Sequence, residues 1–284
     1  MSLRRLSQCG ILITMYSGLT LTRNSGRLFG GHQHIDRVAR RHLNELLPKT
    51  APFPSIRPIL HFEGKNGPDG IKRKSPSKNE PWHFFEPLKG DTKPFMKLLT
   101  AHYKQLVIQL KAKNKERAAF EAAWLAHAAV DGMTPPHHYP YEVKLAEIRG
   151  GAAKEDRTTV MQKWIFKGDT KTKTMKNIFK VWGPRGLFIA HGMFELGFGF
   201  IIKPLRFPDA RPTVHDIAQA KKLGYEEYFL KQARKIALMQ LFEDYIASGW
   251  TAKLSRQVRE ELAPIMIKTV TVLWYEASEE AGIK

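Results

Sequence analysis

The chain has 284 residues, and its 46 Lys and Arg residues outnumber its 27 Asp and Glu residues, which gives a net charge of +19. It has a single cysteine, Cys9. The cysteine count excludes an intrachain disulfide framework and a Cys-ligated zinc site, and the excess of positive charge favours a polyanionic partner.

Residues 1–29 form the first distinct segment. MSLRR precedes GILITMYSGLTL, which gives the outline of a signal peptide, with a basic start before an apolar stretch. Polar residues interrupt that stretch, and it is shorter than the roughly 20 residues that span a bilayer. We therefore treat residues 1–29 as a signal or a disordered segment. Residues 30–284 contain no Pro/Ser-rich linker, so we expect one domain there.

Apolar residues recur at helical spacing along this domain, and alternating strand patterns are nearly absent. The sequence therefore predicts an all-α, single-domain, multi-helix bundle. Four of the predicted helices are marked by their apolar positions, and the third of these is long. The positions are Ile35, Ala39, Leu43 and Leu46; Phe95, Leu98, Leu99, Tyr103, Leu106 and Leu110; Tyr228, Phe229, Ile236, Met239, Leu241, Phe242 and Ile246; and Val270, Val272, Leu273 and Trp274.

Two clusters of histidines and carboxylates indicate a metal site. The first is His127-x3-Asp131-x5-His137, and the second is His191-x3-Glu195. Residues four apart lie on one face of a helix, so each His/acid pair can hold one ion. The segments 122–133 and 186–202 are otherwise almost wholly apolar, and a buried carboxylate there stays ionised when a divalent cation neutralises it.

A basic insert at about 142–185 lies between the two clusters. Within it, lysines alternate with aromatic residues over residues 163–185, against a single acidic residue, Asp169. Such a segment can follow a phosphate backbone while bases stack, or lie on an anionic lipid surface. The alternative is a solvated loop or the exposed face of a basic helix.

Four motifs together resemble the bacterial zinc-dependent phospholipases C. They are GGHQHIDRVARRHL (30–43), PDGIKRKSPSKNEPWHFFEP (68–87), AHAAVDGMTPPHH (126–138) and AHGMFE (190–195). The first carries a His followed by x2-Ile-x3-Ala, and the second carries an Asp and then a His in an HFYDP-like motif. The fungal single-strand-specific nucleases share this plan. The resemblance covers motif positions over residues 32–195.

The resemblance implies a trinuclear-type cluster of two to three Zn²⁺ ions between helices. It assigns Asp69, His83 and His127 to the first ion, with Asp131 bridging from this ion to another. It assigns His137, His191 and Glu195 to the second ion, and His32 and Asp131 to the third. The family completes the third site with a mature N-terminal Trp. Arg27 stands at that position here, and no Trp precedes Trp82.

Function follows from the same resemblance. It implies a zinc-dependent phosphodiesterase that hydrolyses phospholipid headgroups, in which Asp69 also orients or deprotonates the attacking water, and it implies a secreted or periplasmic protein. A single-strand-specific nuclease of the same fold is the first alternative. The second is a non-catalytic, zinc-stabilised protein that binds a membrane surface or single-stranded nucleic acid.

Overall fold

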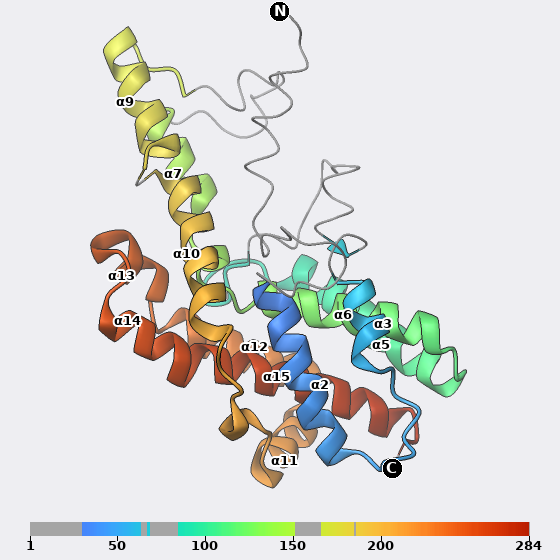
Figure 1. The fold of residues 1–284 in the computed structure, drawn as a ribbon. Coiled ribbons are helices and arrows are strands. Elements are labelled where there is room, and N and C mark those ends of the chain that lie inside the picture. The colour runs from blue at the N-terminus through green and yellow to red at the C-terminus, as the bar shows by residue number, and fades with distance from the viewer. Residues whose placement is uncertain (1–29, 64–66, 69–84, 151–165, 185, 284) are drawn as a thin grey trace, which may run out of the picture.

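The computed structural model describes residues 30–63, 67–68, 85–150, 166–184 and 186–283 (Figure 1). The predictions for residues 1–29, for Asp69 and His83, and for the part of the basic insert at 151–165 lie outside these residues.

All regular elements of the described ranges are helical, so the all-α prediction is confirmed. The elements are α2 (Gly31–Leu46), α3 (Ile56–His61), α5 (Lys93–Lys111), α6 (Lys115–Asp131), η1 (Pro135–His138), α7 (Tyr141–Ile148), α9 (Lys171–Trp182), α10 (Leu187–Ile202), η2 (Pro208–Ala210), α11 (Val214–Leu223), α12 (Tyr225–Ala237), α13 (Leu241–Ser248), α14 (Ala252–Gln257), η3 (Val258–Leu262) and α15 (Ala263–Glu280).

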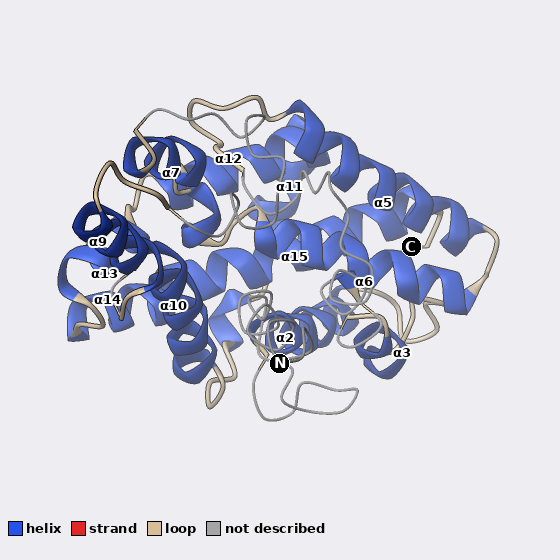
Figure 2. Cartoon of the chain, turned by 90° about the horizontal axis from the view of Figure 1, so that it is seen from above, coloured by secondary structure: helices blue, strands red, loops and turns tan. Residues whose placement is uncertain are grey.

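Helix α15 is the centre of the bundle. Figure 2 shows it with α2 on one side and α5 and α6 on another, and it packs against all three. Most of its apolar side chains are fully buried, and two of its polar groups approach the backbones of neighbouring helices. Trp274 Nε1 donates to the Ala122 carbonyl on α6 at 3.0 Å, and Thr271 Oγ1, which donates to the Ile267 carbonyl within α15 at 2.7 Å, also lies 3.5 Å from the Ala39 carbonyl on α2. Helix α15 thus packs between α2 and α6, which carry the predicted ligands His32, His127 and Asp131.

Helix α6 packs closely because its buried face is mostly alanine, a strong helix former with a small side chain. The helix begins at Asn114, whose side chain accepts from the Arg117 backbone N–H. Beyond its last residue, Gly132 leaves room for two aromatic rings: a Cβ there would lie 2.4 Å from Phe95 and 2.7 Å from Phe229. These contacts fix the end of α6, where two predicted ligands lie.

The prediction of one long helix through residues 228–246 is wrong. The chain forms α12 and α13, separated by a turn in which Gln240 adopts a left-handed conformation with φ of 52°. Met239 N–H bonds to the Ile236 carbonyl, which closes the turn. Apolar residues keep their helical spacing across this turn, and it contains no Gly or Pro, so periodicity alone could not locate it.

The described part of the basic insert contains a helix, α9, which lies with α7 away from α15 (Figure 1). Asn177 Nδ2 donates to the Ile148 carbonyl at 3.0 Å and links the two helices. By length and composition, the stretch Lys171–Ile202, which includes residue 185 outside the described ranges, could cross a membrane. The core helix of a protein outside a membrane can have the same length and composition. Helix α10, which lies within this stretch, carries two of the predicted metal ligands, His191 and Glu195.

Glu276 on α15 gives a pH-dependent stability. Burial, together with Glu279 and despite Lys221, raises the pKa of this half-buried carboxyl to about 7. Between its ordinary value of 4.5 and about 7 the folded chain therefore binds more protons than the unfolded chain, and stability falls as the pH rises through this window. A Glu276→Gln variant should match the parent near pH 5 and exceed its free energy of unfolding near pH 8 by about 1 kcal/mol, allowing for solvent screening.

Denaturant unfolding at both pH values measures this difference. Glu260→Gln is a suitable control, because Glu260 is exposed and its substitution should change stability equally at both pH values. An effect of Glu276→Gln that does not vary with pH would contradict the prediction.

Candidate metal centre

Four histidines and three carboxylates converge between α2, α6 and α10. They come from five places in the chain: the first turn of α2, the residues after α3, the end of α6, η1, and the middle of α10. All are buried apart from Glu195, whose side chain is 11% exposed. These residues are His32, Glu63, His127, Asp131, His137, His191 and Glu195.

Asp131 lies at the middle of this group. Its Oδ2 is 3.3 Å from His127 Nε2, one helical turn earlier on α6, and its Oδ1 is 3.4 Å from His32 Nε2 on α2. The two imidazole rings stack with centroids 4.3 Å apart and planes at 18°. His137 Nδ1 lies 3.6 Å from Asp131 Oδ1, so the carboxylate faces three histidines. The structure therefore brings together four of the proposed ligands, His32, His127, Asp131 and His137.

A second group forms around Glu195 on α10. Its Oε1 lies 2.9 Å from His191 Nε2, one turn earlier on the same helix, and 3.2 Å from His137 Nε2 on η1. The His137 and His191 rings have centroids 5.1 Å apart. Because His137 contacts both Asp131 and Glu195, the two groups are continuous.

The ring nitrogens of the histidines follow one pattern. In three of them, Nδ1 lies within hydrogen-bond distance of an oxygen atom. His127 Nδ1 is 2.9 Å from Glu63 Oε1, and His137 Nδ1 is 3.0 Å from the Asp131 carbonyl. His191 Nδ1 is 3.1 Å from the Tyr141 hydroxyl. In the tautomer that donates these bonds, Nε2 carries a lone pair directed at Asp131 or Glu195. Metal-binding histidines are oriented in this way.

Burial and neighbouring groups shift the pKa values of Asp131 and His137. Burial alone would raise the pKa of Asp131, but His127 and His137 outweigh it and hold that pKa well below its ordinary value. Burial lowers the pKa of His137, which favours the neutral imidazole. An ionised carboxylate and a neutral imidazole are the forms that coordinate divalent ions.

The donors fit a divalent metal ion. Two sets, His32 with Glu63 and His127, and His137 with His191 and Glu195, each bring one ligand atom per residue within 4.8 Å of the others. Ligands at 2.0–2.1 Å from a tetrahedral zinc lie about 3.3 Å apart, and the distances from Asp131 to the Nε2 atoms of His32 and His127, 3.4 and 3.3 Å, agree with this spacing. These buried groups could therefore hold a metal ion.

Sequence reasoning missed Glu63, Tyr141 and Asp36. Glu63 and Tyr141 follow no motif spacing. Asp36 did carry a signal, because His32-x3-Asp36 repeats the spacing of the other two His/acid pairs. Asp36 is buried on α2, where burial, reinforced by the Glu63 carboxylate, raises its pKa well above the ordinary value. The protonated form is thus favoured, and a neutral carboxyl is a weak metal ligand.

Four other histidines bond elsewhere. His34 and His42 bond through Nε2 to the carbonyls of Leu205 and Phe207 at 3.0 and 2.9 Å, which fixes α2 against the segment that follows α10. His102 Nδ1 lies 2.7 Å from Glu121 Oε2, and His138 Nε2 lies 2.9 Å from the Gly132 carbonyl. These bonds give the four histidines structural roles outside the centre.

Comparisons with protein-family models, with curated proteins and with solved structures found no match to this chain. The function is therefore inferred from the residues and geometry of the centre.

Proposed function

We propose that the protein is a zinc-dependent phosphodiesterase, similar to the bacterial zinc-dependent phospholipases C. One observation carries the proposal: four histidine Nε2 atoms face two carboxylates, the buried Asp131 and the largely buried Glu195, between helices. The order of these residues along the chain is the order of the motifs that resemble that family.

The proposed ligand sets follow the two groups. His137, His191 and Glu195 hold one ion. His32, His127 and Asp131 hold a second or share two, and Asp69 and His83 are proposed to complete that set. Bound zinc would activate a water for attack on phosphorus and offset charge on the phosphoryl oxygens. Asp69 is proposed to orient that water or to accept its proton.

A catalytic role is favoured over a purely structural one by the ligand types and by exposure. Structural zinc sites are usually closed by four protein ligands that include Cys, whereas nitrogen and oxygen ligands shared among several ions leave positions for water. The side chains of His191 and Glu195 are 7% and 11% exposed, whereas those of His127 and Asp131 are fully buried. Substrate would therefore approach at α10.

Helix α9 supports a lipid surface as the partner. Met175 and Phe179, four residues apart, are 66% and 65% exposed, and Lys171, Lys176 and Lys180 are exposed beside them. Apolar side chains flanked by lysines suit insertion into an anionic lipid interface. Since α9 precedes α10 in the chain and packs against it, this surface adjoins the helix that carries His191 and Glu195. Single-stranded nucleic acid remains the alternative, because the same lysines can contact phosphates.

Parallel assays of the zinc-loaded protein test the proposal. The substrates are a short-chain phosphatidylcholine and single-stranded DNA, each with and without chelator. Chelator-sensitive release of phosphocholine is the expected result. Chelator-sensitive cleavage of DNA alone would favour the nuclease, and no turnover of either substrate by protein that retains zinc would favour the non-catalytic binding protein.

Replacing Lys171, Lys176 and Lys180 by Gln should weaken binding to anionic vesicles by roughly 100-fold, since each lysine near such a surface contributes about 1 kcal/mol. The turnover of a small soluble phosphodiester should not change, because these residues lie outside the metal centre. Vesicle sedimentation and soluble-substrate kinetics provide the two measurements.

The matched control replaces Lys231, Lys235 and Lys253, which are also exposed, by Gln. It changes the net charge equally at other helices. Equal weakening by both triple variants would show that only total charge matters, and unchanged vesicle binding by the α9 variant would contradict the docking surface.

A further inference from the structure

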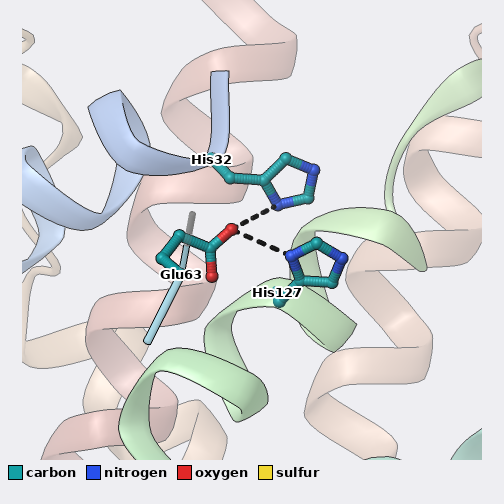
Figure 3. Close-up of side chains that lie close together, drawn as sticks. All are labelled: His32, Glu63 and His127. Atoms are coloured by element: carbon teal, nitrogen blue, oxygen red, sulfur yellow. Dashed lines mark hydrogen bonds and ion pairs between the residues drawn. The ribbon is translucent and has the colours of Figure 1, made fainter. Parts of the chain in front are cut away.

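Glu63 lies behind the centre, on the opposite side of two histidines from Asp131. It is 2% exposed, and its Oε1 lies 2.9 Å from His127 Nδ1 and 3.6 Å from His32 Nδ1 (Figure 3). Its Oε2 has no hydrogen-bond partner among the residues described by the structure. One buried carboxylate oxygen therefore faces two imidazoles that both point their other nitrogen at Asp131.

The position of Glu63 is set by packing. It follows α3, which packs against α6, and the preceding Phe62 contacts Phe120 of α6 edge-to-face at 5.6 Å. The two histidine rings are nearly parallel, and the same Glu63 oxygen lies at hydrogen-bond distance from His127 Nδ1 and just beyond it from His32 Nδ1. The backbone that carries Glu63 is thus held against the helix that carries His127.

Glu63 has two candidate roles, as a ligand of the metal or as a hydrogen-bond acceptor from a histidine that binds the metal. The 2.9 Å between Glu63 Oε1 and His127 Nδ1 is the length of a charge-assisted N–H···O hydrogen bond. The 3.3 and 3.4 Å between Asp131 and the Nε2 atoms are longer than such a bond and suit ligands that share an ion. In the tautomer that donates to Glu63, the His127 Nε2 lone pair faces Asp131, so the metal would lie on the Asp131 side, with Glu63 as a hydrogen-bond acceptor and not a ligand.

The geometry points to Glu63 as the positioning residue of the metal centre: its carboxylate accepts a hydrogen bond from His127 Nδ1 and so holds the tautomer in which the His127 Nε2 lone pair faces Asp131. This inference rests on the proposed metal centre and adds a residue that the family resemblance did not supply. Loss of the carboxylate should weaken the bond between the metal and His127 Nε2.

The test is a graded series of variants, Glu63→Gln and Glu63→Leu. Gln keeps a neutral acceptor at this position, and Leu keeps the bulk without an acceptor. Apo-protein is titrated with Zn²⁺ in competition with a chromophoric chelator, elemental analysis gives the number of bound ions, and Co²⁺ is added to record its d–d spectrum. Metal affinity should fall by about 10-fold for Gln and about 100-fold for Leu, with the number of ions at saturation unchanged.

Glu121→Gln is the matched control. Glu121 is also a buried carboxylate on the α6 side of the bundle, and it accepts a hydrogen bond from His102 Nδ1 at 2.7 Å, outside the centre. This variant also replaces a charged acceptor of a histidine Nδ1 by a neutral one, and it should keep the parent's metal affinity and Co²⁺ spectrum. If Glu63→Leu does not fold, Glu63→Gln still gives the affinity and the spectrum.

Two outcomes overturn the inference. A Glu63→Gln variant that binds one ion fewer than the parent would make Glu63 a ligand, and one that matches the parent in affinity and spectrum would remove its role. Failure of the proposed function is distinguishable, since a parent protein that binds no Zn²⁺ or Co²⁺ would refute the metal centre whatever the Glu63 variants do.

Discussion

An Asp131→Asn variant is expected to lose phosphodiesterase activity by roughly 1000-fold, equivalent to about 4 kcal/mol of transition-state stabilisation. Asp131 lies within 3.6 Å of nitrogen atoms of His32, His127 and His137, so its charge faces three of the proposed histidine ligands. An amide keeps the shape but supplies one neutral oxygen, which binds zinc weakly.

His32→Ala should cost less than Asp131→Asn. His32 contributes one nitrogen, and the family resemblance places it in the third site, whose N-terminal Trp is absent from this sequence. Initial rates on the soluble phosphodiester, with circular dichroism to confirm folding, would rank the two variants. Equal losses in folded proteins would contradict this ranking, and a larger loss for His32→Ala would mean that the third site is complete.

Removing the metal should lower the unfolding temperature by about 15 °C or more. Two ions, each present at about 1000 times its dissociation constant, would stabilise the folded chain by about 4 kcal/mol each, and 1 kcal/mol corresponds to about 2–4 °C in a domain of this size. The carboxylates of Asp131 and Glu195 would lose their counter-charge at the same time.

Thermal unfolding with and without chelator measures this effect, and elemental analysis of the zinc-supplemented protein should find at least two ions per chain. Re-addition of zinc should restore the higher transition temperature. Fewer than one bound ion per chain after supplementation would refute the metal centre, and an unchanged transition despite complete metal removal would refute its part in stability.

Local spacing predicted the parts of the centre that lie within single helices. The i,i+4 rule placed His127 beside Asp131, and His191 beside Glu195, because both pairs lie on helices whose apolar character was evident in the sequence. The helices around Ile35 and Phe95 followed from apolar periodicity in the same way.

Contacts between distant elements were not predictable from spacing. Glu63 lies in a connection, and its approach to His127 depends on how α3 packs against α6. The Nδ1 contact of His137 with the Asp131 carbonyl depends on the turn between α6 and η1. The roles of Asp69 and His83 remain predictions, since both residues lie outside the described ranges.

The central place of α15 has a consequence for the order of events during biosynthesis. This helix provides no ligand, yet its Trp274 and Thr271 contacts hold α6 and α2 together. A ribosome makes α15 after every proposed ligand, and a domain gains its packed core only when the elements of that core are present. Nascent chains stalled before Ala263 would therefore have all the proposed ligands but no assembled metal centre, and zinc capture would wait until α15 has been made and packed.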